Sequence, residues 1–242
     1  MEMKCIYIEE CESTMNEARN QWKKNANSNG YILYTHNQTN GRGRGTHQWS
    51  SKTNDIIFTF LCKVETEETL RKTGVVSLLT MSQLLKELYN INLKGKWPND
   101  GYINNKKLMG ILIEVDWNDG MFYVNIGIGL NVEMKQLNTS ISLSELIDIS
   151  SLDELKLFSL FQERFFKLLQ YDVHTLLEMF NDIDFLKGKK VLICNTKYED
   201  DIDQYIEGVI VGYSENWNVM VDVDGIIMEF DREEIVLPSS FY

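Results

Sequence analysis

Residues 108–132 read LMGILIEVDWNDGMFYVNIGIGLNV, and this stretch decides which class of fold the chain adopts. Two runs of strand-forming residues flank the tripeptide Asn-Asp-Gly at positions 118–120, a combination that is typical of a tight hairpin turn. We therefore expect strands over residues 108–117 and 121–132. Helical segments lie on both sides of this hairpin in the sequence, which predicts an α+β domain.

Working outward from the hairpin, further strands are expected over residues 5–9, 31–35 and 56–62, and helices over 15–24, 69–90, 151–171 and 172–186. Thr14 and Glu17, three residues apart, form a capping box at the start of the first helix. From Gly188 the pattern changes to short β segments over 190–195, 205–212, 217–223 and 226–230. We therefore predict an α+β domain over residues 1–187 and a small β barrel over 188–242.

The composition and charge argue against several classes of protein. Of the 242 residues 43% are hydrophobic, which argues against disorder. No apolar run approaches the ~20 residues that span a bilayer. A net charge of −12 argues against binding to nucleic acid or to an anionic membrane. Four widely spaced cysteines and the absence of a signal peptide predict a cytoplasmic protein, and the three histidines show no metal-ligand spacing.

The segment Gly41-Arg42-Gly43-Arg44-Gly45 lies in a long polar loop. Glycines let backbone amides surround an anion, and the arginine side chains add donors for phosphate or carboxylate. The segment is neither a P-loop nor a dinucleotide-binding fingerprint. Taken alone, it fits a site for a small anion and a solvated basic loop equally well.

A second motif is Lys96-Trp97-Pro98-Asn99-Asp100, which predicts a turn. Lys107 and Gly110 follow it, so the turn places Asp100 and Lys107 on adjacent chain segments. A glycine beside a lysine suits the close approach of a charged group. Taken alone, Lys107 fits a solvated surface lysine better.

Two glycines in the second strand of the hairpin, Gly127 and Gly129, predict a smooth groove or, with equal weight, a bulged strand packed against a helix. Asn131 at the end of this strand has a donor and an acceptor for a heterocycle. Ser13 and Thr14 fit helix capping better than ligand binding. The Trp49 ring could stack on a nucleotide base or pack in the core, and packing in the core is the commoner role of tryptophan.

Together and in this order, these motifs resemble one family closely, the biotin protein ligases. The resemblance rests on Glu12-Ser13-Thr14, Gln38-Thr39, Gly41 to Arg44, Trp49, Lys96 to Asp100, Lys107 with Gly110 and Glu114, and Gly127 with Gly129 and Asn131. It covers residues 5–132 motif by motif, and the rest of the chain to residue 238 only in layout. It implies a mixed sheet packed with helices, a biotin–lipoate ligase core like that of class II aminoacyl-tRNA synthetases, followed by an SH3-like barrel. No DNA-binding domain precedes Ser13, so we expect the single-function form.

The resemblance implies a role for each matched residue. The biotin site is expected to comprise Ser13, Thr14, Gln38, Gly41, Arg42, Gly43, Arg44, Lys107, Gly110, Gly127 and Gly129. Within this set the first three hold the ureido ring, and the last three form the wall of the slot. The ATP site is expected to comprise Arg44, His47, Trp49, Lys107 and Asn131, with Trp49 and Asn131 at the adenine. The catalytic residues are expected to be Arg42, Arg44, Lys107 and Asp100, where Asp100 orients or deprotonates the incoming lysine.

Four positions depart from the family pattern. Met15 stands where an asparagine is common, so a ureido contact from this position is not expected. Asn40, Thr46-His47 and Ser51-Lys52 differ within the loop, and they leave the role of His47 open.

The implied reaction activates biotin with ATP and Mg²⁺ to biotinyl-5′-AMP, which then acylates a lysine of a biotin carboxyl carrier domain. The enzyme would be a monomer or a homodimer, and its metal ligands are not predicted. The closest alternative is a lipoate or octanoate ligase or transferase with the same core fold. A catalytically silent biotin-binding module is a second alternative, but the retention of both arginines, Asp100 and Lys107 argues against it. The acidic run at 199–203 argues against nucleic-acid binding through the barrel.

Overall fold

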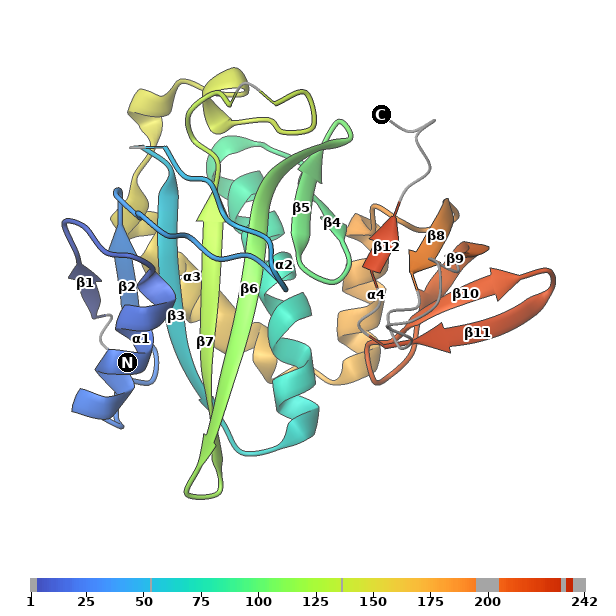
Figure 1. Cartoon of the computed structure of the whole chain (residues 1–242), viewed down its shortest axis with the longest axis horizontal. Helices are drawn as coiled ribbons and strands as arrows, with labels where there is room; N and C mark the ends of the chain where they lie inside the picture. Colours follow the sequence, from blue (N-terminus) through green and yellow to red (C-terminus); the bar gives the residue numbers. More distant parts are fainter. Residues whose placement is uncertain (1–3, 53, 136, 195–204, 232–233, 237–242) are drawn as a thin grey trace.

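A seven-stranded sheet forms the centre of the molecule, in the order β1-β2-β3-β7-β6-β5-β4 (Figure 1). The computed structural model describes residues 4–52, 54–135, 137–194, 205–231 and 234–236. The strands are β1 (Cys5–Tyr7), β2 (Ile32–Thr35), β3 (Ile56–Val64), β4 (Lys94–Lys96), β5 (Asp100–Ile103), β6 (Lys106–Asn118) and β7 (Met121–Leu130). β1 pairs with β2 in parallel, and the other neighbours are antiparallel.

The predicted hairpin is confirmed as β6 and β7. Asn118 pairs with Met121, so the connection is a two-residue turn of Asp119 and Gly120. Both turn residues have positive φ, +50° and +75°, which is the geometry that Asp-Gly turns adopt most readily. The hairpin is the longest pairing in the sheet and supplies the surface on which the cavity described below is built.

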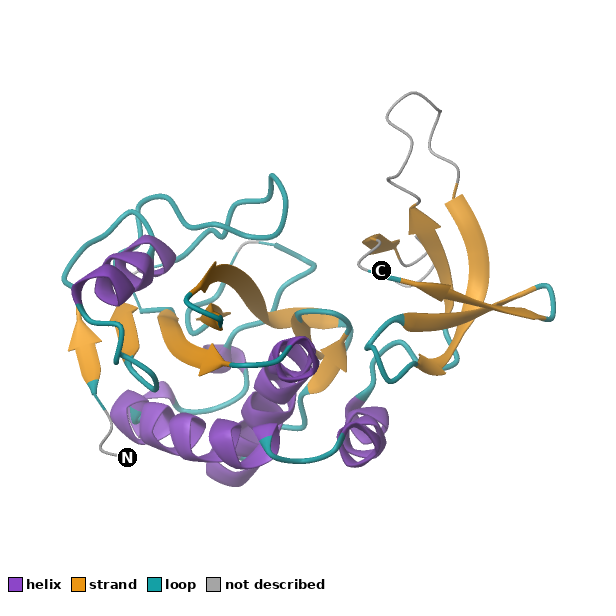
Figure 2. Ribbon diagram, turned by 90° about the horizontal axis from the view of Figure 1, so that it is seen from below, coloured by secondary structure: helices purple, strands orange, loops and turns teal. Residues whose placement is uncertain are grey.

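Helices cover both faces of the sheet (Figure 2). The four α-helices are α1 (Thr14–Lys24), α2 (Glu67–Tyr89), α3 (Glu154–Leu169) and α4 (Val173–Ile183), and two short 3₁₀ helices, Leu143–Glu145 and Ile149–Ser151, precede α3. On one face, Phe58 and Phe60 of β3 pack against Phe158, Phe161 and Phe165 of α3. On the opposite face α1 buries its apolar side against β2, β3 and β7 through a smaller cluster. Because α1 covers only part of this second face, the rest is available for a site.

The helix α1 starts differently from the sequence prediction. Its N-cap is Ser13, which has an extended backbone and accepts a hydrogen bond from the Met15 N–H at 3.3 Å, and Thr14 is already helical. The prediction of a capping box formed by Thr14 and Glu17 is therefore wrong. The Thr14 hydroxyl is unsuited to capping because it accepts a hydrogen bond from Thr59 on β3.

The C-terminal region forms a separate antiparallel sheet in the order β11-β10-β9-β8-β12. Its strands are β8 (Lys190–Cys194), β9 (Tyr205–Tyr213), β10 (Val219–Val223), β11 (Ile226–Phe230) and β12 (Glu234–Val236). Asp224 and Gly225 make the predicted hairpin turn, whereas β12 lies where the sequence indicated no strand. Its buried side chains are continuous with the main core, because Phe180 of α4 contacts Tyr213 and Trp217 on one side and Gly95 of β4 on the other. Among the described residues, no helix is both long enough and apolar enough to span a membrane.

Candidate active site

A cavity of about 600 Å³ opens on the sheet face that α1 leaves partly uncovered. The start of α1, the loop over residues 41–49, the turn between β4 and β5, and the middle of the β6–β7 hairpin enclose it. The lining residues that the sequence singled out are Ser13, Thr14, Gln38, Arg42, Gly43, Arg44, His47, Trp49, Asp100, Lys107, Gly110, Gly127 and Gly129. Motifs that lie more than a hundred residues apart therefore meet in one place.

The floor of the cavity is made by glycines on paired strands. Gly110 of β6 lies opposite Gly129 of β7, and Gly127 is two residues along the same strand. A Cβ atom on Gly127 would come within 2.7 Å of the Met15 Sδ atom, and one on Gly129 would collide with the Trp49 indole. The strand carries no bulge here, and the glycines are required because Cβ atoms would enter the space that Met15 of α1 and Trp49 occupy.

One end of the cavity lies against α1, and we call it the α1 end: Thr14, Met15, Gln38, Arg42 and Gly127. The Thr14 N–H donates to Gln38 Oε1 at 3.0 Å, and its hydroxyl accepts from Thr59 at 2.8 Å. Thr59 is fully buried on β3, and no motif in the sequence pointed to its part in the site. These bonds fix the polar atoms of the α1 end before any ligand arrives.

The glycine-arginine loop folds back on itself as a narrow hairpin. The Gly43 N–H donates to the His47 carbonyl at 2.8 Å, and the Trp49 N–H donates to the Gly41 carbonyl at 3.0 Å. Gly45 at the tip has φ +57° and no neighbouring atom, so the turn itself requires glycine there. Gly41 does not line the cavity, and a Cβ on it would collide with Gln38.

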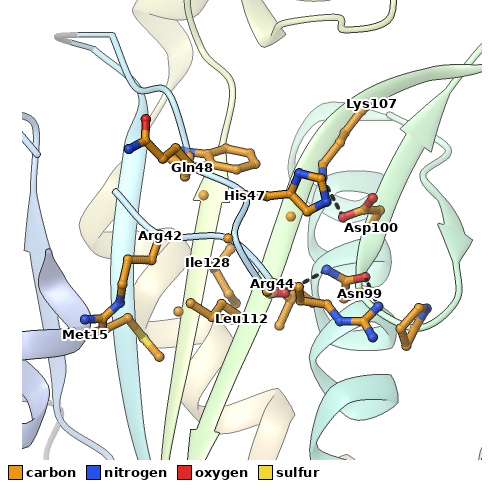
Figure 3. A pocket seen from close by; sticks show the side chains of 18 of the residues that line it. Met15, Arg42, Arg44, His47, Gln48, Asn99, Asp100, Lys107, Leu112 and Ile128 are labelled. Atoms are coloured by element: carbon orange, nitrogen blue, oxygen red, sulfur yellow. Dashed lines mark hydrogen bonds and ion pairs between the residues drawn. The ribbon is translucent and has the colours of Figure 1, made fainter. Parts of the chain in front are cut away.

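The two loop arginines point to different ends of the cavity (Figure 3). Arg42 donates to Asn16 Oδ1 at 2.7 Å and to Glu114 Oε2 at 3.0 Å. Glu114 also pairs with Arg19, so it neutralises two guanidinium groups. Arg44 lies near the turn between β4 and β5 and donates to Asn99 Oδ1 at 3.4 Å.

The opposite end, which we call the turn end, comprises Arg44, Asn99, Asp100 and Lys107. Lys107 Nζ lies 2.7 Å from Asp100 Oδ1, with 32% of the lysine and 17% of the aspartate side chain exposed. The His47 ring projects toward this ion pair in Figure 3. The predicted proximity of Asp100 and Lys107 is confirmed, and Lys107 is a paired lysine rather than a solvated one.

Trp49 and Asn131, the two residues expected at an adenine, differ in position. The Trp49 ring lies over Gly129 and Gly110 inside the cavity. Asn131 is buried outside it and donates to the carbonyls of Lys107 and Ile141, each at 3.2 Å. In this position Asn131 ties the start of β6 to the segment that follows β7.

The C-terminal sheet contributes to the same site through a residue that the sequence analysis did not single out. Ile235 of β12 lines the cavity. Trp97, which precedes Asn99 in the turn, is buried, and its indole N–H donates to the Trp217 carbonyl at 3.1 Å. The turn end therefore rests on the C-terminal sheet.

Neither a metal cluster nor an activated thiol is found near the cavity among the residues that the structure describes. No group of three His, Cys, Asp or Glu side chains there could hold a metal ion. Burial, and then the charges of Glu17 and Glu10, raise the pKa of Cys11 to about 11, so its thiol is protonated at neutral pH. The chemically active groups that line the site are its cations, hydroxyls, amides and Asp100.

Comparison with known proteins identifies the family. The family model described as the biotin/lipoate A/B protein ligase family matches residues 7–131, just over half of the chain. The chain belongs to the biotin/lipoate A/B protein ligase family. Every lining residue assigned to the α1 end and the turn end falls within the matched range.

Relatives in the biotin/lipoate ligase family include two curated proteins. Biotin–protein ligase 2 of Arabidopsis thaliana is 26% identical over 221 residues, which cover 83% of this chain and 64% of that protein. The bifunctional ligase/repressor BirA of Bacillus subtilis is 34% identical over 150 residues, which cover 57% of this chain and 46% of that protein. The chain thus spans less than two thirds of the length of these relatives.

Solved structures of the family agree with the fold along nearly the whole chain. The biotin protein ligase from Aquifex aeolicus in complex with biotin and ATP has a TM-score of 0.76 and 25% identity, covering 96% of this chain and 97% of that one. The ligase from Leishmania major in complex with biotinyl-5-AMP has a TM-score of 0.66 and 22% identity, covering 94% and 98%. The predicted mixed sheet packed with helices is confirmed by these likenesses.

Proposed function

We propose that the protein is an ATP-dependent biotin ligase that forms biotinyl-5′-AMP and transfers the biotinyl group to a lysine of a biotin carboxyl carrier domain. The observation that carries this proposal is one cavity with two unlike ends. The α1 end presents fixed neutral donors and acceptors beside Arg42, whose charge Glu114 balances, and the turn end presents Arg44 and the ion pair of Lys107 with Asp100. A ligand with a polar ring at one end and a reacting carboxylate at the other matches this arrangement. The Aquifex relative, solved with biotin and ATP, supports the choice of substrates.

At the α1 end, the ureido ring of biotin would meet Ser13, Thr14 and Gln38. The acyl chain would lie along the glycine floor between Met15 and Leu112, where a Cβ atom would obstruct it. Held at one end, the carboxylate is presented to the turn end in a single orientation, which lowers the entropic cost of the reaction.

In the first step, the biotin carboxylate attacks the α-phosphate of ATP, the bond to the β-phosphate breaks, and pyrophosphate leaves. Two anions must approach each other, so positive charge is needed where the negative charge redistributes. Lys107 and Arg44 line the cavity at the turn end, and Arg42 lines it at the α1 end. A phosphate that enters would compete with Asp100 for the Lys107 ammonium.

In the second step, the neutral amine of a carrier lysine attacks the mixed anhydride, and AMP leaves. Once Lys107 turns to the phosphate, the Asp100 carboxylate can accept a proton from the incoming ammonium or orient it. No covalent enzyme intermediate is required, in keeping with the protonated Cys11 thiol. The anhydride is protected while the loop over residues 41–49 covers the cavity.

Mg²⁺ would enter with ATP as part of the substrate. Among the described residues the site offers single oxygen ligands such as Asp100 rather than a cluster that could hold the ion alone. This fits the way Mg²⁺ is usually bound, through one or two protein oxygens and the substrate phosphates. When bound, the ion would neutralise phosphate charge.

The C-terminal sheet is proposed to be an SH3-like module beginning at residue 188, and the carrier domain is proposed to dock beside it. Its contacts with Trp97 and the cavity support a role at the turn end. We also propose that the protein acts in the cytoplasm.

A biotin-dependent release of pyrophosphate tests the proposal. The protein is incubated with Mg·ATP and either biotin, lipoate or octanoate. We expect release only with biotin, because the α1 end holds hydrogen-bonding groups that a dithiolane or an alkyl chain leaves unpaired. Equal release with lipoate or octanoate would overturn the proposal in favour of a lipoate ligase, the other activity within the family description. Mass spectrometry of retained biotinyl-AMP separates catalysis from silent binding.

A further inference from the structure

A fully buried carboxylate, Asp55, lies directly before β3 and belongs to none of the sequence motifs. Its Oδ1 atom accepts hydrogen bonds from the backbone N–H groups of Val132 at 2.8 Å and Glu133 at 3.3 Å. Its Oδ2 atom accepts from the Lys52 N–H at 2.9 Å and pairs with the Lys135 ammonium at 3.1 Å. Four donors on two chain segments therefore converge on one side chain. A buried charge with this many partners is costly to disturb.

The two segments joined by Asp55 are the outgoing arm of the glycine-arginine loop and the chain that follows β7. Lys135 strengthens the same link, because its ammonium also donates to the Ser50 carbonyl at 2.6 Å. Only 10% of the Lys135 side chain is exposed. A pair of Asn54 with Glu133 joins the segments a third time at the surface. The position of one segment thus depends on the other.

The Lys135 ammonium also lies 4.9 Å from the centroid of the Trp49 ring. The Lys107 ammonium lies 5.6 Å from the same centroid, and the ring packs against Gly129 and Gly110. Its indole N–H is buried, with no hydrogen-bond partner among the described residues. A cation over an indole face is attractive, and the attraction grows when the pair is shielded from water. The ring is therefore held by its packing against the glycine floor and by two cations, of which Lys135 is the nearer to the ring centroid.

We propose that Asp55 and Lys135 are positioning residues for the nucleotide end of the cavity: Asp55 fixes Lys135, and Lys135 fixes the Trp49 ring against Gly129. The inference rests on the proposed function and on the expected contact of Trp49 with the adenine of ATP. Neither residue touches the reacting atoms. Their effect passes through the place and orientation of Trp49, so it concerns ATP and not biotin.

The kinetic test compares Lys135→Met, which removes the charge but keeps a long side chain, with Lys135→Arg, which keeps the charge. Lys135→Met should raise the KM for ATP about 2- to 30-fold, the range of a cation–π contact, and change the KM for biotin less than about 2-fold. Lys135→Arg should restore most of the ATP affinity. Lys190→Met removes a lysine from the exposed pair with Glu207, away from the site, and serves as the matched control. Equal changes for both substrates, or no change for ATP, would overturn the proposal.

A fluorescence test reports on the ring without any catalysis. The fluorescence of Trp49 is obtained as the difference in emission between a protein and the same protein with Trp49→Phe. Quenching of this fluorescence by acrylamide measures the access of solvent to the ring. We expect stronger quenching of this signal in Lys135→Met and in Asp55→Asn than in Lys190→Met. If Asp55→Asn fails to fold, the quenching measured in Lys135→Met alone decides whether Lys135 holds the Trp49 ring.

The two tests separate failure of this inference from failure of the proposed function. A parent protein without biotin-dependent pyrophosphate release would overturn the function, while the quenching comparison would still decide whether Lys135 holds Trp49. Quenching that is identical in Lys135→Met and the parent would overturn the positioning inference even in an active ligase.

Discussion

Arg42 and Arg44 are two residues apart in one loop, yet they serve opposite ends of the cavity. Arg42 is bound by Asn16 and by Glu114 at distances of 2.7 and 3.0 Å. The contact of Arg44 with Asn99 is longer, 3.4 Å, and its neighbour Lys107 pairs with Asp100 at 2.7 Å and lies 5.6 Å from the centroid of the Trp49 ring. The α1 end is a network of bonds already made, whereas the turn end consists of cations whose present partners a phosphate can replace.

This difference suggests a division of labour within the proposed reaction. A neutral ring is recognised best by donors and acceptors that cannot move, because a misfit then leaves buried polar groups unpaired. A reacting phosphate changes its charge distribution, so it needs cations close to the reacting oxygens. Substitutions at the α1 end should therefore alter the binding of biotin, and those at the turn end should alter the rate of adenylation.

Lys107→Ala at the turn end should produce the largest effect. Loss of one aimed cationic donor costs ~2.7–4 kcal/mol, or about 10²–10³ in the rate of adenylation, while the affinity for biotin changes far less. Pyrophosphate release under single-turnover conditions measures the rate, and calorimetry measures the affinity. Lys106→Ala, the neighbouring lysine that does not line the cavity, is the control. An unchanged rate in Lys107→Ala would show that the lysine serves only as a partner of Asp100.

Arg44→Gly should separate formation of the adenylate from its retention. The adenylate should still form, because Arg42 and Lys107 remain, but it should dissociate faster by roughly 10- to 100-fold, the value of a charged hydrogen bond. The freed anhydride would acylate any exposed lysine, so an unrelated lysine-rich protein added to the reaction should become biotinylated. Arg42→Gly is the comparison, and it should weaken biotin binding without increasing bystander labelling. Equal bystander labelling by Arg44→Gly and the parent enzyme, with adenylate still produced, would contradict the assignment.

Alanine substitutions at Gly127 and Gly129 should affect the two ends of the cavity separately, because each added Cβ atom meets a different side chain. A Cβ on Gly129 meets the Trp49 ring, which is held in place, whereas a Cβ on Gly127 meets the Met15 thioether at 2.7 Å. The thioether can rotate away, so Gly127→Ala should be the milder change. We expect Gly129→Ala to raise the KM for ATP about 5- to 30-fold, as overpacking by 1–2 kcal/mol would, and Gly127→Ala to act on biotin alone by a smaller factor. If the KM for ATP and the KM for biotin changed in the same proportion in both variants, the division of the cavity into two separate ends would be refuted.

Arg19→Ala should have the smallest effect. Arg19 shares Glu114 with Arg42, but 40% of its side chain is exposed, so the pair contributes at most about 1 kcal/mol. The KM for biotin should rise less than about 5-fold, because Glu114 keeps Arg42. Steady-state kinetics would compare the KM for biotin in Arg19→Ala and in Arg42→Ala. The comparison shows whether the pair of Glu114 with Arg42 also requires Arg19. A larger rise in the KM for biotin in Arg19→Ala than in Arg42→Ala would contradict the assignment of Arg42 as the arginine that serves the α1 end.

Local patterns in the sequence were sufficient for the parts of the molecule that depend on neighbouring residues. The Asp119-Gly120 turn, the strands around it and the long α2 helix follow from turn chemistry and periodicity. The glycine floor also follows, because glycine within a strand signals a close neighbour. The start of α1 is the exception, and it failed because the Thr14 hydroxyl was already bonded to a strand 45 residues away.

Tertiary structure alone decided which partner each functional side chain has. Glu114 lies 72 residues from Arg42, Val132 lies 77 residues from Asp55, and Trp217 lies 120 residues from Trp97. The sequence determined that cations, glycines and a carboxylate are present in a recognisable order. It could not determine that Arg42 binds Glu114 while Arg44 binds Asn99, or that Ile235 reaches the cavity. Hydrogen bonds between distant segments depend on how strands and helices pack, and no local pattern of residues encodes that packing.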